Sequence, residues 1–161
     1  MLDPFPAEVE LLPAVPHHLA GVQALSRGSL RLSAMTIRTL IVDDSPLTTE
    51  LIATYLENIP DVELVASAHS AADALACAST SPLDLVITDL RMPLVNGIEL
   101  AERLRRRHPA VRIVLLSVEK TSQLMQTAAR KGVDVFVDKG ELHEELIASI
   151  HKLFPDSARS K

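Results

Sequence analysis

Three carboxylates follow apolar runs in this sequence at places where a strand would end. Asp89 closes the run of residues 83–88 and is followed at once by a loop. Asp43 and Asp44 close a second apolar run, residues 39–42. Carboxylate oxygens are ligands that hard divalent cations such as Mg²⁺ prefer, so three acids gathered at one place would form a metal site.

Two further polar residues stand at equivalent places. Ser117 closes another apolar run, and Lys139 follows one more. A metal ion, a hydroxyl donor and a cation around one carboxylate are the groups that phosphoryl transfer requires. Asp89 would be the nucleophile and form an acyl phosphate, while Lys139 and Ser117 would bind phosphoryl oxygens. Taken alone, Asp43 and Asp44 would be an ordinary turn and helix start, so the inference depends on the whole set.

Apolar runs alternate with amphipathic segments from residue 37 to residue 154. Ser45 followed by Pro46 is a favourable helix start, Gly132 is a favourable helix end, and the basic run at 103–108 suits the end of a helix. The spacing predicts strands over residues 37–43, 62–66, 83–88, 111–116 and 133–137. It predicts helices over residues 45–59, 70–78, 97–108, 121–131 and 141–154.

Continuous apolar strands that alternate with helices are typical of a parallel sheet covered on both faces. We therefore expect an α/β fold of the flavodoxin-like type, a doubly wound five-stranded parallel sheet of order 2-1-3-4-5 with helices on both faces. In that order the first and third strands are neighbours. Asp43, Asp44 and Asp89 would then meet at the carboxyl edge of the sheet, where such folds bind their ligands.

The composition excludes several classes of protein. Hydrophobic residues make up 47 % of the 161 residues, which is enough for a core. The net charge of −5 and the 2 % of aromatic residues argue against a surface that binds nucleic acid. Cys77 alone cannot form an internal disulfide, and no apolar run is long enough to cross a membrane. Because the acidic start is unlike a secretory signal, we expect the protein in the cytoplasm.

Residues 1–35 differ from the rest because they hold four of the ten prolines, which interrupt helices. We expect a disordered N-terminal extension over residues 1–35, a folded domain over residues 36–154 and a C-terminal tail over residues 155–161. Two other interpretations of the first segment are open: an interaction segment, or a leader that precedes a true start at Met35.

These motifs resemble those of the receiver domains of two-component response regulators. The matching pieces are LIVDD at 40–44, DLRMPLVNG at 89–97, LLS at 115–117 and FVDK at 136–139. The resemblance covers residues 37–154. It implies that Asp89 is the phosphoacceptor, with Ser117 and Lys139 as its catalytic partners. The phosphodonor would be a phosphohistidine on a sensor histidine kinase or a phosphotransfer protein.

The resemblance also implies a cofactor and a switch. Mg²⁺ would be held by oxygen ligands at four residues: Asp44 directly, Asp43 mainly through water, Asp89, and Arg91 through its backbone carbonyl. Ser117 and Phe136 would form the switch that alters a protein-binding surface once Asp89 is phosphorylated.

The expected function is that of a stand-alone receiver similar to the single-domain chemotaxis regulators, because only seven residues follow Phe154. We expect the output to be a changed surface for an unidentified downstream protein or for a phosphorylation-dependent homodimer. We expect no direct contact with nucleic acid or membrane, and no enzyme activity beyond the phosphorylation and dephosphorylation of Asp89 itself.

Two residues depart from the pattern of the family that the chain resembles. Val118 stands where Ala or Gly is usual, and Gly140 stands where many receivers have Pro. A branched side chain at Val118 would narrow access to Asp89 and slow transfer in either direction.

Three alternative functions are open. The chain would instead be an intermediate in a phosphate relay, or a pseudo-receiver that binds proteins without being phosphorylated. Pseudo-receivers often lack one of the acids or the lysine, and this chain retains them all. A phosphatase with an aspartyl nucleophile is the third alternative, but such enzymes place Asp-x-Asp at the first strand, whereas here Asp43 and Asp44 are adjacent.

Overall fold

The structure, a computed structural model, describes residues 36–155. In chain order its elements are β1 (Ile37–Val42), α2 (Pro46–Glu57), β2 (Val62–Ala68), α3 (Ala71–Thr80), β3 (Leu85–Asp89), α4 (Gly97–Arg107), β4 (Arg112–Ser117), α5 (Ser122–Arg130), β5 (Val135–Asp138), η2 (Lys139–Glu141) and α6 (Leu142–Leu153). The expected N-terminal extension and residues 156–161 of the expected tail lie outside the described residues.

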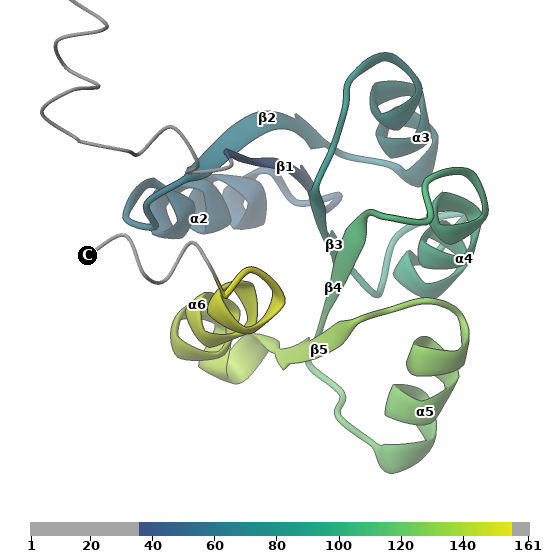
Figure 1. Ribbon diagram of the computed structural model, residues 1–161. Coiled ribbons are helices and arrows are strands. Elements are labelled where there is room, and N and C mark those ends of the chain that lie inside the picture. Colours follow the sequence, from purple (N-terminus) through teal and green to yellow (C-terminus); the bar gives the residue numbers. More distant parts are fainter. Residues whose placement is uncertain (1–35, 156–161) are drawn as a thin grey trace, which may run out of the picture. The chain divides into compact units, whose positions relative to one another are not determined.

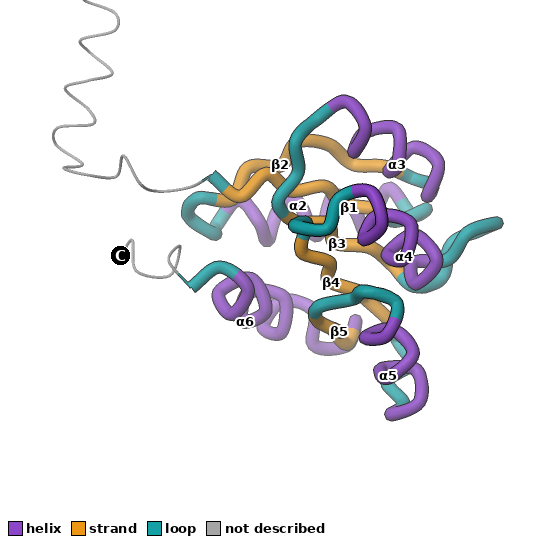
Figure 2. The backbone as a smooth tube through the Cα atoms, turned by 45° about the vertical axis from the view of Figure 1, so that its right-hand side comes forward, coloured by secondary structure: helices purple, strands orange, loops and turns teal. Residues whose placement is uncertain are grey.

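The five strands form one sheet in the order β2-β1-β3-β4-β5, and every neighbouring pair is parallel. Helices α2 and α6 cover one face of this sheet, and α3, α4 and α5 cover the other (Figure 1). The turned view in Figure 2 shows the strands between these helix layers. The predicted α/β fold, a flavodoxin-like doubly wound sheet of order 2-1-3-4-5, is therefore confirmed.

Each face of the sheet has its own hydrophobic core. Strand β3 lies in the middle of the sheet, and all five of its residues are buried. Its side chains alternate, because Val86 belongs to the core on one face and Leu85 and Ile87 belong to the core on the other. The continuous apolar runs in the sequence therefore reflect strands that are covered on both sides.

Side-chain caps set the starts of two helices at the carboxyl edge of the sheet. The Ser45 hydroxyl accepts the N–H of Thr48 at the start of α2. The Asn96 side-chain oxygen accepts the N–H groups of Ile98 and Glu99, each at 2.9 Å, at the start of α4. Because these helices begin directly after the loops that follow β1 and β3, their caps hold the loops beside the acids.

Three predicted strands differ from the observed ones by one or two residues. The strands expected at 83–88, 111–116 and 133–137 are β3, β4 and β5, which begin and end later. The apolar residues Leu83, Val111 and Val133 misled the prediction because they pack against a core from loops rather than from strands.

Two smaller features were also not predicted. Strand β2 and helix α3 run two residues beyond their predicted ends, to Ala68 and Thr80. A short 3-10 helix, η2, precedes α6. Among residues 36–155, no helix combines the length and the apolar character needed to span a membrane.

Candidate functional site

The register of the central strands brings the predicted acids together. Val42 of β1 lies opposite Thr88 of β3, so the next residues, Asp43 and Asp89, lie side by side at the carboxyl edge of the sheet. One carboxylate oxygen from each of Asp43, Asp44 and Asp89 lies within 4.8 Å of the other two. Three acids from the ends of two strands thus form one cluster.

Lys139 reaches this acidic cluster from the edge strand β5. Ser117 at the end of β4 pairs with Asp138 at the end of β5, and Lys139 follows directly. The Lys139 ammonium nitrogen lies 2.8 Å from an Asp89 oxygen and 3.2 Å from an Asp43 oxygen. One cation therefore bridges two carboxylates that belong to different strands.

Burial and charge act in opposite directions on the carboxylate of Asp89. Asp43 and Asp89 expose only 1 % and 6 % of their surfaces. Burial raises the pKa of the Asp89 carboxyl and the charge of Asp43 adds to this rise, while the hydrogen bond and charge of Lys139 oppose it; the net direction is upward. Burial lowers the pKa of Lys139, but its bonds to Asp89 and Asp43 raise it above the ordinary value. Lys139 therefore remains a cation at neutral pH.

The acidic cluster fits a divalent cation in charge and in donor type. Three carboxylates facing one ammonium group leave two formal negative charges uncompensated. Asp43 accepts the N–H of Ser45 at 2.9 Å with one oxygen and the Lys139 ammonium with the other. Asp44 is exposed and makes no hydrogen bond within residues 36–155. Oxygen donors of this kind suit Mg²⁺, which keeps several waters and takes one or two carboxylates.

Ser117 and Arg91 adjoin the acidic cluster. Asp89 lies opposite Leu116, which places Ser117 one position beyond it on β4. Ser117 is buried, and its hydroxyl accepts the N–H of Glu119 at 3.0 Å. The backbone of Arg91 favours the ionised form of Asp89 and slightly opposes the rise of its pKa, so the loop that carries the predicted carbonyl ligand lies next to the acid.

Phe136, which was predicted to act with Ser117, lies on β5. It is partly buried and packs against the core under α3, α4 and α5. It lies opposite Leu115, two residues before the paired residues Ser117 and Asp138. Since side chains two positions apart share a face, Phe136 and Ser117 face the same side of the sheet.

Gly97 is a residue of the site whose role the sequence pattern did not reveal. A Cβ atom at this position would lie 2.2 Å from the backbone oxygen of Asp89 and 2.7 Å from the Leu115 side chain. Gly97 also donates its N–H to the backbone oxygen of Leu90 at 2.9 Å. Helix α4 therefore begins in direct contact with Asp89, which requires a residue without a side chain.

The departure at Gly140 has a structural explanation. Its N–H donates a 2.8 Å hydrogen bond to the Asp138 carboxylate at the start of η2. Proline has no N–H and would lose this bond. The bond holds the turn that carries Lys139, so a residue other than proline suits this chain at position 140.

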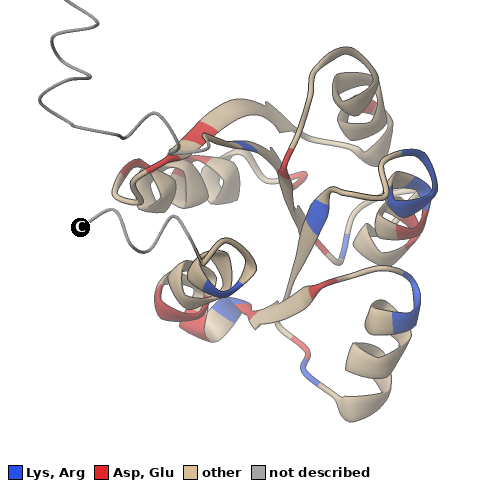
Figure 3. Ribbon diagram, in the orientation of Figure 1, with Lys and Arg blue, Asp and Glu red and all other residues tan. Residues whose placement is uncertain are grey.

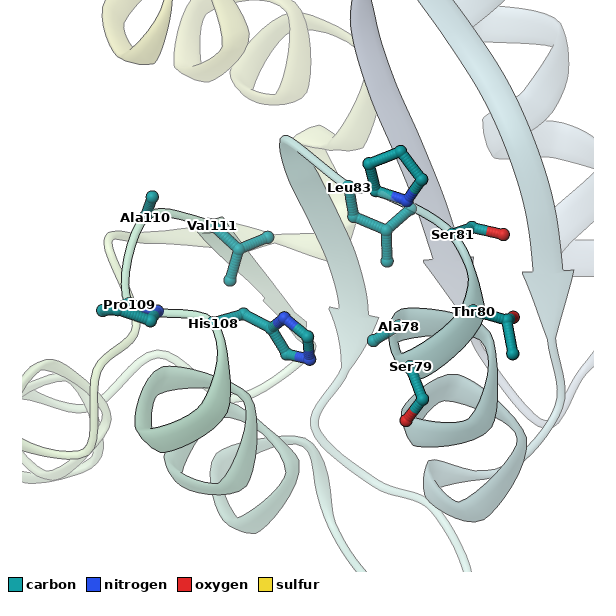
Figure 4. Close-up of a pocket in the computed structure, with 10 residues that line it drawn as sticks. Ala78, Ser79, Thr80, Ser81, Leu83, His108, Pro109, Ala110 and Val111 are labelled. Carbon is teal, nitrogen blue, oxygen red and sulfur yellow. The ribbon is translucent and has the colours of Figure 1, made fainter.

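A pocket at the opposite edge of the sheet has a different character (Figure 4). It lies between the end of α3, the loop that leads to β3 and the loop that leads to β4. The hydroxyls of Ser79 and Thr80 donate to backbone oxygens of their own helix, and His108 is the titratable residue of the lining. Because its lining contains no carboxylate, this pocket lacks the groups that form the acidic cluster.

Comparison with known proteins places these features in a family. The sequence model of the response regulator receiver domain matches residues 39–151. The chain is similar to the nitrate/nitrite response regulator protein NarL of Escherichia coli K12, with 29 % identity over 113 residues, 70 % of this chain and 52 % of the relative. It is also similar to the response regulator UvrY of that strain, with 28 % identity over 118 residues, 73 % of this chain and 54 % of the relative. The chain thus spans about half the length of these relatives.

Solved structures of receiver domains have the same fold. The response regulator domain of CheB from Thermotoga maritima matches with a TM-score of 0.67 and 26 % identity, over 73 % of this chain and 96 % of that chain. A two-component response regulator of the LuxR family from Aurantimonas sp. SI85-9A1 matches with a TM-score of 0.70 and 28 % identity, over 78 % and 94 %. The matched residues 39–151 form more than half of this sequence and include the acidic cluster and Lys139, and the chain belongs to the response regulator receiver domain family.

Proposed function

We propose that residues 36–154 form a receiver that takes a phosphoryl group onto Asp89. The donor is a phosphohistidine on a sensor histidine kinase or a phosphotransfer protein, and we place the exchange in the cytoplasm. The observation that supports this most is the position of the Lys139 ammonium group, within 3.2 Å of oxygens of both Asp89 and Asp43. We propose no activity or partner that belongs to the part of these relatives that the chain does not span.

The transfer exchanges one bond to phosphorus for another. An Asp89 oxygen attacks phosphorus, the P–N bond to the donor imidazole breaks, and the imidazole leaves with a proton from solvent. Lys139 binds one phosphoryl oxygen as a point charge. The Ser117 hydroxyl, which accepts the Glu119 N–H before transfer, keeps its own proton and can donate it to a second phosphoryl oxygen.

The three carboxylates of the acidic cluster would bind a doubly charged metal ion. Asp43, Asp44, Asp89 and the carbonyl of Arg91 are the residues that would hold Mg²⁺, and the bound ion would supply positive charge against the incoming phosphoryl group. The protein acts on its own side chain, so the proposed chemistry is phosphorylation and dephosphorylation of Asp89 without turnover of a separate substrate.

The proposed output is a change in the face formed by α5, β5 and α6. Ser117 and Phe136 lie on β4 and β5 next to that face, on the same side of the sheet. A phosphoryl group adds close to two negative charges, which draw Ser117 toward it and leave space for Phe136 to rotate. The altered face would bind an unidentified downstream protein or a second copy of the chain, without direct contact with nucleic acid or membrane.

A phosphate relay is the second candidate role. It would use the same acceptor and the same lysine at the same edge of the sheet. In a relay the face formed by α5, β5 and α6 would stay unchanged after phosphorylation, whereas in a switch that face would change.

The test of the proposed function is phosphorylation by acetyl phosphate in the presence of Mg²⁺, measured by intact-mass analysis. The wild-type chain should gain one phosphoryl group, and Asp89→Asn should gain none. Asp73→Asn, which changes an exposed acid in the first turn of α3, is the matched control and should react as the wild type does. An equal adduct on Asp89→Asn and wild type would contradict the assignment of Asp89.

A further inference from the structure

The turn that follows β1 and carries Asp43 and Asp44 is hydrogen-bonded to the end of the neighbouring strand β2. Val42 pairs with Ala68 at the end of β2, and the Asp43 N–H donates to the backbone oxygen of Ala68 at 3.1 Å. In a parallel ladder the backbone oxygen of Asp43 would next accept an N–H two residues beyond Ala68. That residue is Ser70, which instead begins α3 as its N-cap, and within residues 36–155 no backbone N–H donates to the Asp43 oxygen.

The side chain of His69 takes the place of the missing backbone donor. Its Nδ1 atom lies 2.9 Å from the backbone oxygen of Asp43, 26 residues away in the sequence. Because a carbonyl oxygen can only accept, Nδ1 must carry the hydrogen. The imidazole therefore adds one bond beyond the end of the ladder and leaves Ser70 to cap α3, where the Ser70 hydroxyl accepts the Asp73 N–H at 3.1 Å.

The bond from His69 is made to the peptide group between Asp43 and Asp44. This group is planar, so fixing its oxygen also fixes the direction in which Asp44 continues the chain. The Asp44 carboxylate has no hydrogen bond of its own within residues 36–155. Its place in the acidic cluster therefore depends on the backbone, and the backbone oxygen that precedes it is held by His69.

Neither hydrophobic core depends on the imidazole ring. His69 is exposed, and it belongs to neither of the cores on the two faces of the sheet. It is also not one of the three residues of the acidic cluster, so the ring is not placed to bind an ion together with those acids. An effect of His69 on the site would therefore be transmitted through the backbone oxygen of Asp43.

We propose that His69 is a positioning residue of the metal site, whose Nδ1–H holds the Asp43–Asp44 peptide in the orientation that keeps both carboxylates in the acidic cluster. This inference rests on the proposed function, because the cluster contributes to phosphoryl transfer through the Mg²⁺ that it would hold. Without the bond, the peptide can turn and the Asp44 carboxylate samples positions outside the cluster. Binding of Mg²⁺ must then order the turn, which lowers the affinity while leaving Asp89 and Lys139 unaltered.

The test is a titration of the full chain with Mg²⁺, monitored by NMR shifts of the loop residues. His69→Ala should weaken Mg²⁺ affinity about tenfold, at the lower end of the losses that are typical when groups behind metal ligands are removed. His69→Asn should retain most of the affinity, because the amide N–H of Asn can occupy the place of the Nδ1–H. His69→Gln carries its amide one carbon further from the backbone and should resemble His69→Ala.

Phosphorylation by acetyl phosphate separates positioning from a direct role in the reaction. In His69→Ala, the Mg²⁺ concentration that gives half of the maximal rate should rise by the same factor as the Kd for Mg²⁺. The rate at saturating Mg²⁺ should equal that of the wild type, since Asp89, Ser117 and Lys139 are unaltered.

His108→Ala is the matched control. His108 lines the pocket at the opposite edge of the sheet, and its loss should leave Mg²⁺ affinity unchanged (Figure 4). A further measurement uses no metal. Without Mg²⁺, ¹⁵N NMR of the wild type should show Nδ1 as the protonated nitrogen of the neutral His69 ring, and backbone ¹⁵N relaxation should show more motion of Asp44 in His69→Ala than in His69→Asn.

Three results would overturn the proposal. His69→Ala would bind Mg²⁺ as tightly as the wild type, or His69→Asn would lose as much affinity as His69→Ala, or the rate at saturating Mg²⁺ would fall in His69→Ala. A failure of the proposed function looks different, because the wild type would then bind no Mg²⁺ at the acidic cluster and carry no adduct on Asp89.

Discussion

At the scale of single residues, the acids of the site differ in what already occupies them. Both Asp43 oxygens have partners, one the N–H of Ser45 and the other Lys139. Asp89 shares Lys139 and is buried, whereas Asp44 is exposed at the rim. A cation that enters from solvent therefore contacts Asp44 first, and within residues 36–155 the Asp44 carboxylate has no hydrogen bond to give up.

This difference predicts unequal contributions to Mg²⁺ binding. Asp44→Asn should weaken Mg²⁺ affinity about tenfold or more, and Asp43→Asn should weaken it less, because both Asp43 oxygens already accept hydrogen bonds from Ser45 and Lys139. Titration monitored by NMR shifts of the loop residues would measure both affinities. Equal losses in the two variants, or unchanged binding by Asp44→Asn, would show that the metal is held differently.

The raised pKa of Asp89 predicts a pH-dependent cost to folding. An acid whose folded pKa lies above its unfolded value of 3.8 destabilises the fold once it is ionised, and this cost is absent below the unfolded pKa. Without Mg²⁺ at neutral pH, Asp89→Asn should therefore melt at a higher temperature than the wild type. The difference should shrink as the pH falls through the raised pKa toward 3.8.

Mg²⁺ provides the control for this prediction. Added Mg²⁺ should stabilise the wild type more than Asp89→Asn, because the variant lacks one of the three carboxylates of the acidic cluster. Thermal unfolding with and without Mg²⁺, at several pH values, measures both effects. A wild type that is the more stable protein in Mg²⁺-free buffer at neutral pH would contradict the argument.

At the scale of elements, the strand ends were predictable and the links between elements were not. An apolar run that stops at Asp or Ser located the ends of β3 and β4 to within one residue, because a buried strand must change composition where it meets solvent. Leu83 and Val111 blurred the starts of the same strands, since a loop residue that packs on the core is as apolar as a strand residue. An ion pair between Arg91 and Glu119 joins loops 28 residues apart, and no spacing rule covers such a distance.

Arg105 illustrates the same difficulty on a helix. Its place in the basic last turn of α4 is explained by the helix dipole alone. In the structure, the Arg105 guanidinium donates to the backbone oxygens of Pro109, Val111 and Gly132 and to the Asp134 carboxylate, at 2.6 to 2.8 Å. The basic ends of α4 and α5 lie near one another (Figure 3). Arg105 therefore has a structural role in holding the loops after α4 and α5, and the composition of the basic helix end does not distinguish it from the neighbouring arginines.

The contact between α4 and Asp89 predicts the effect of a single methyl group. Gly97→Ala should cost about 1–3 kcal/mol of unfolding free energy, since the added Cβ would lie 2.2 Å from the Asp89 backbone oxygen and force the helix start to shift. Urea denaturation measures the cost, and phosphorylation by acetyl phosphate should also slow as Asp89 moves.

Gly140→Ala is the matched control for this substitution. Its Cβ would have its nearest neighbour, an Asp138 side-chain oxygen, at 3.2 Å, and that side chain can move. The control should therefore cost clearly less than Gly97→Ala. Equal costs for the two alanines would show that the loss of glycine, rather than the contact with Asp89, decides the outcome.

At the scale of the whole described domain, Glu145 connects α6 to the site by two polar contacts. Glu145 accepts the Asp138 N–H at 2.9 Å with one oxygen, and its other oxygen lies 3.2 Å from the Lys120 ammonium. It thus links α6 both to the end of β5 and to the loop after β4. A pull on Ser117 by a phosphoryl group would reach α6 by this route, whereas Phe136 packs in the core on the opposite face of the sheet.

The proposed switch predicts where phosphorylation changes the molecule. With the phosphate mimic beryllofluoride and Mg²⁺, amide exchange or NMR shifts should change over residues 118–145 as well as at the acids, because the two states differ in population on the α5, β5 and α6 face. Residues of β2 and α3, which lie away from this face, should stay unchanged and serve as the internal reference (Figure 1). Changes limited to residues 43–44 and 89–97 would favour the relay instead.

The pairing of Val42 with Thr88 limits how this chain can change in length. Successive side chains of a strand point to opposite faces, so one residue gained or lost in β1 or β3 would turn Asp43 or Asp89 away from its partner and break up the acidic cluster in a single step. The connections at the other edge bear none of these groups, so a change of length there leaves the acidic cluster in place. Insertions and deletions among descendants of this sequence should therefore collect at the edge of the sheet that carries no chemistry.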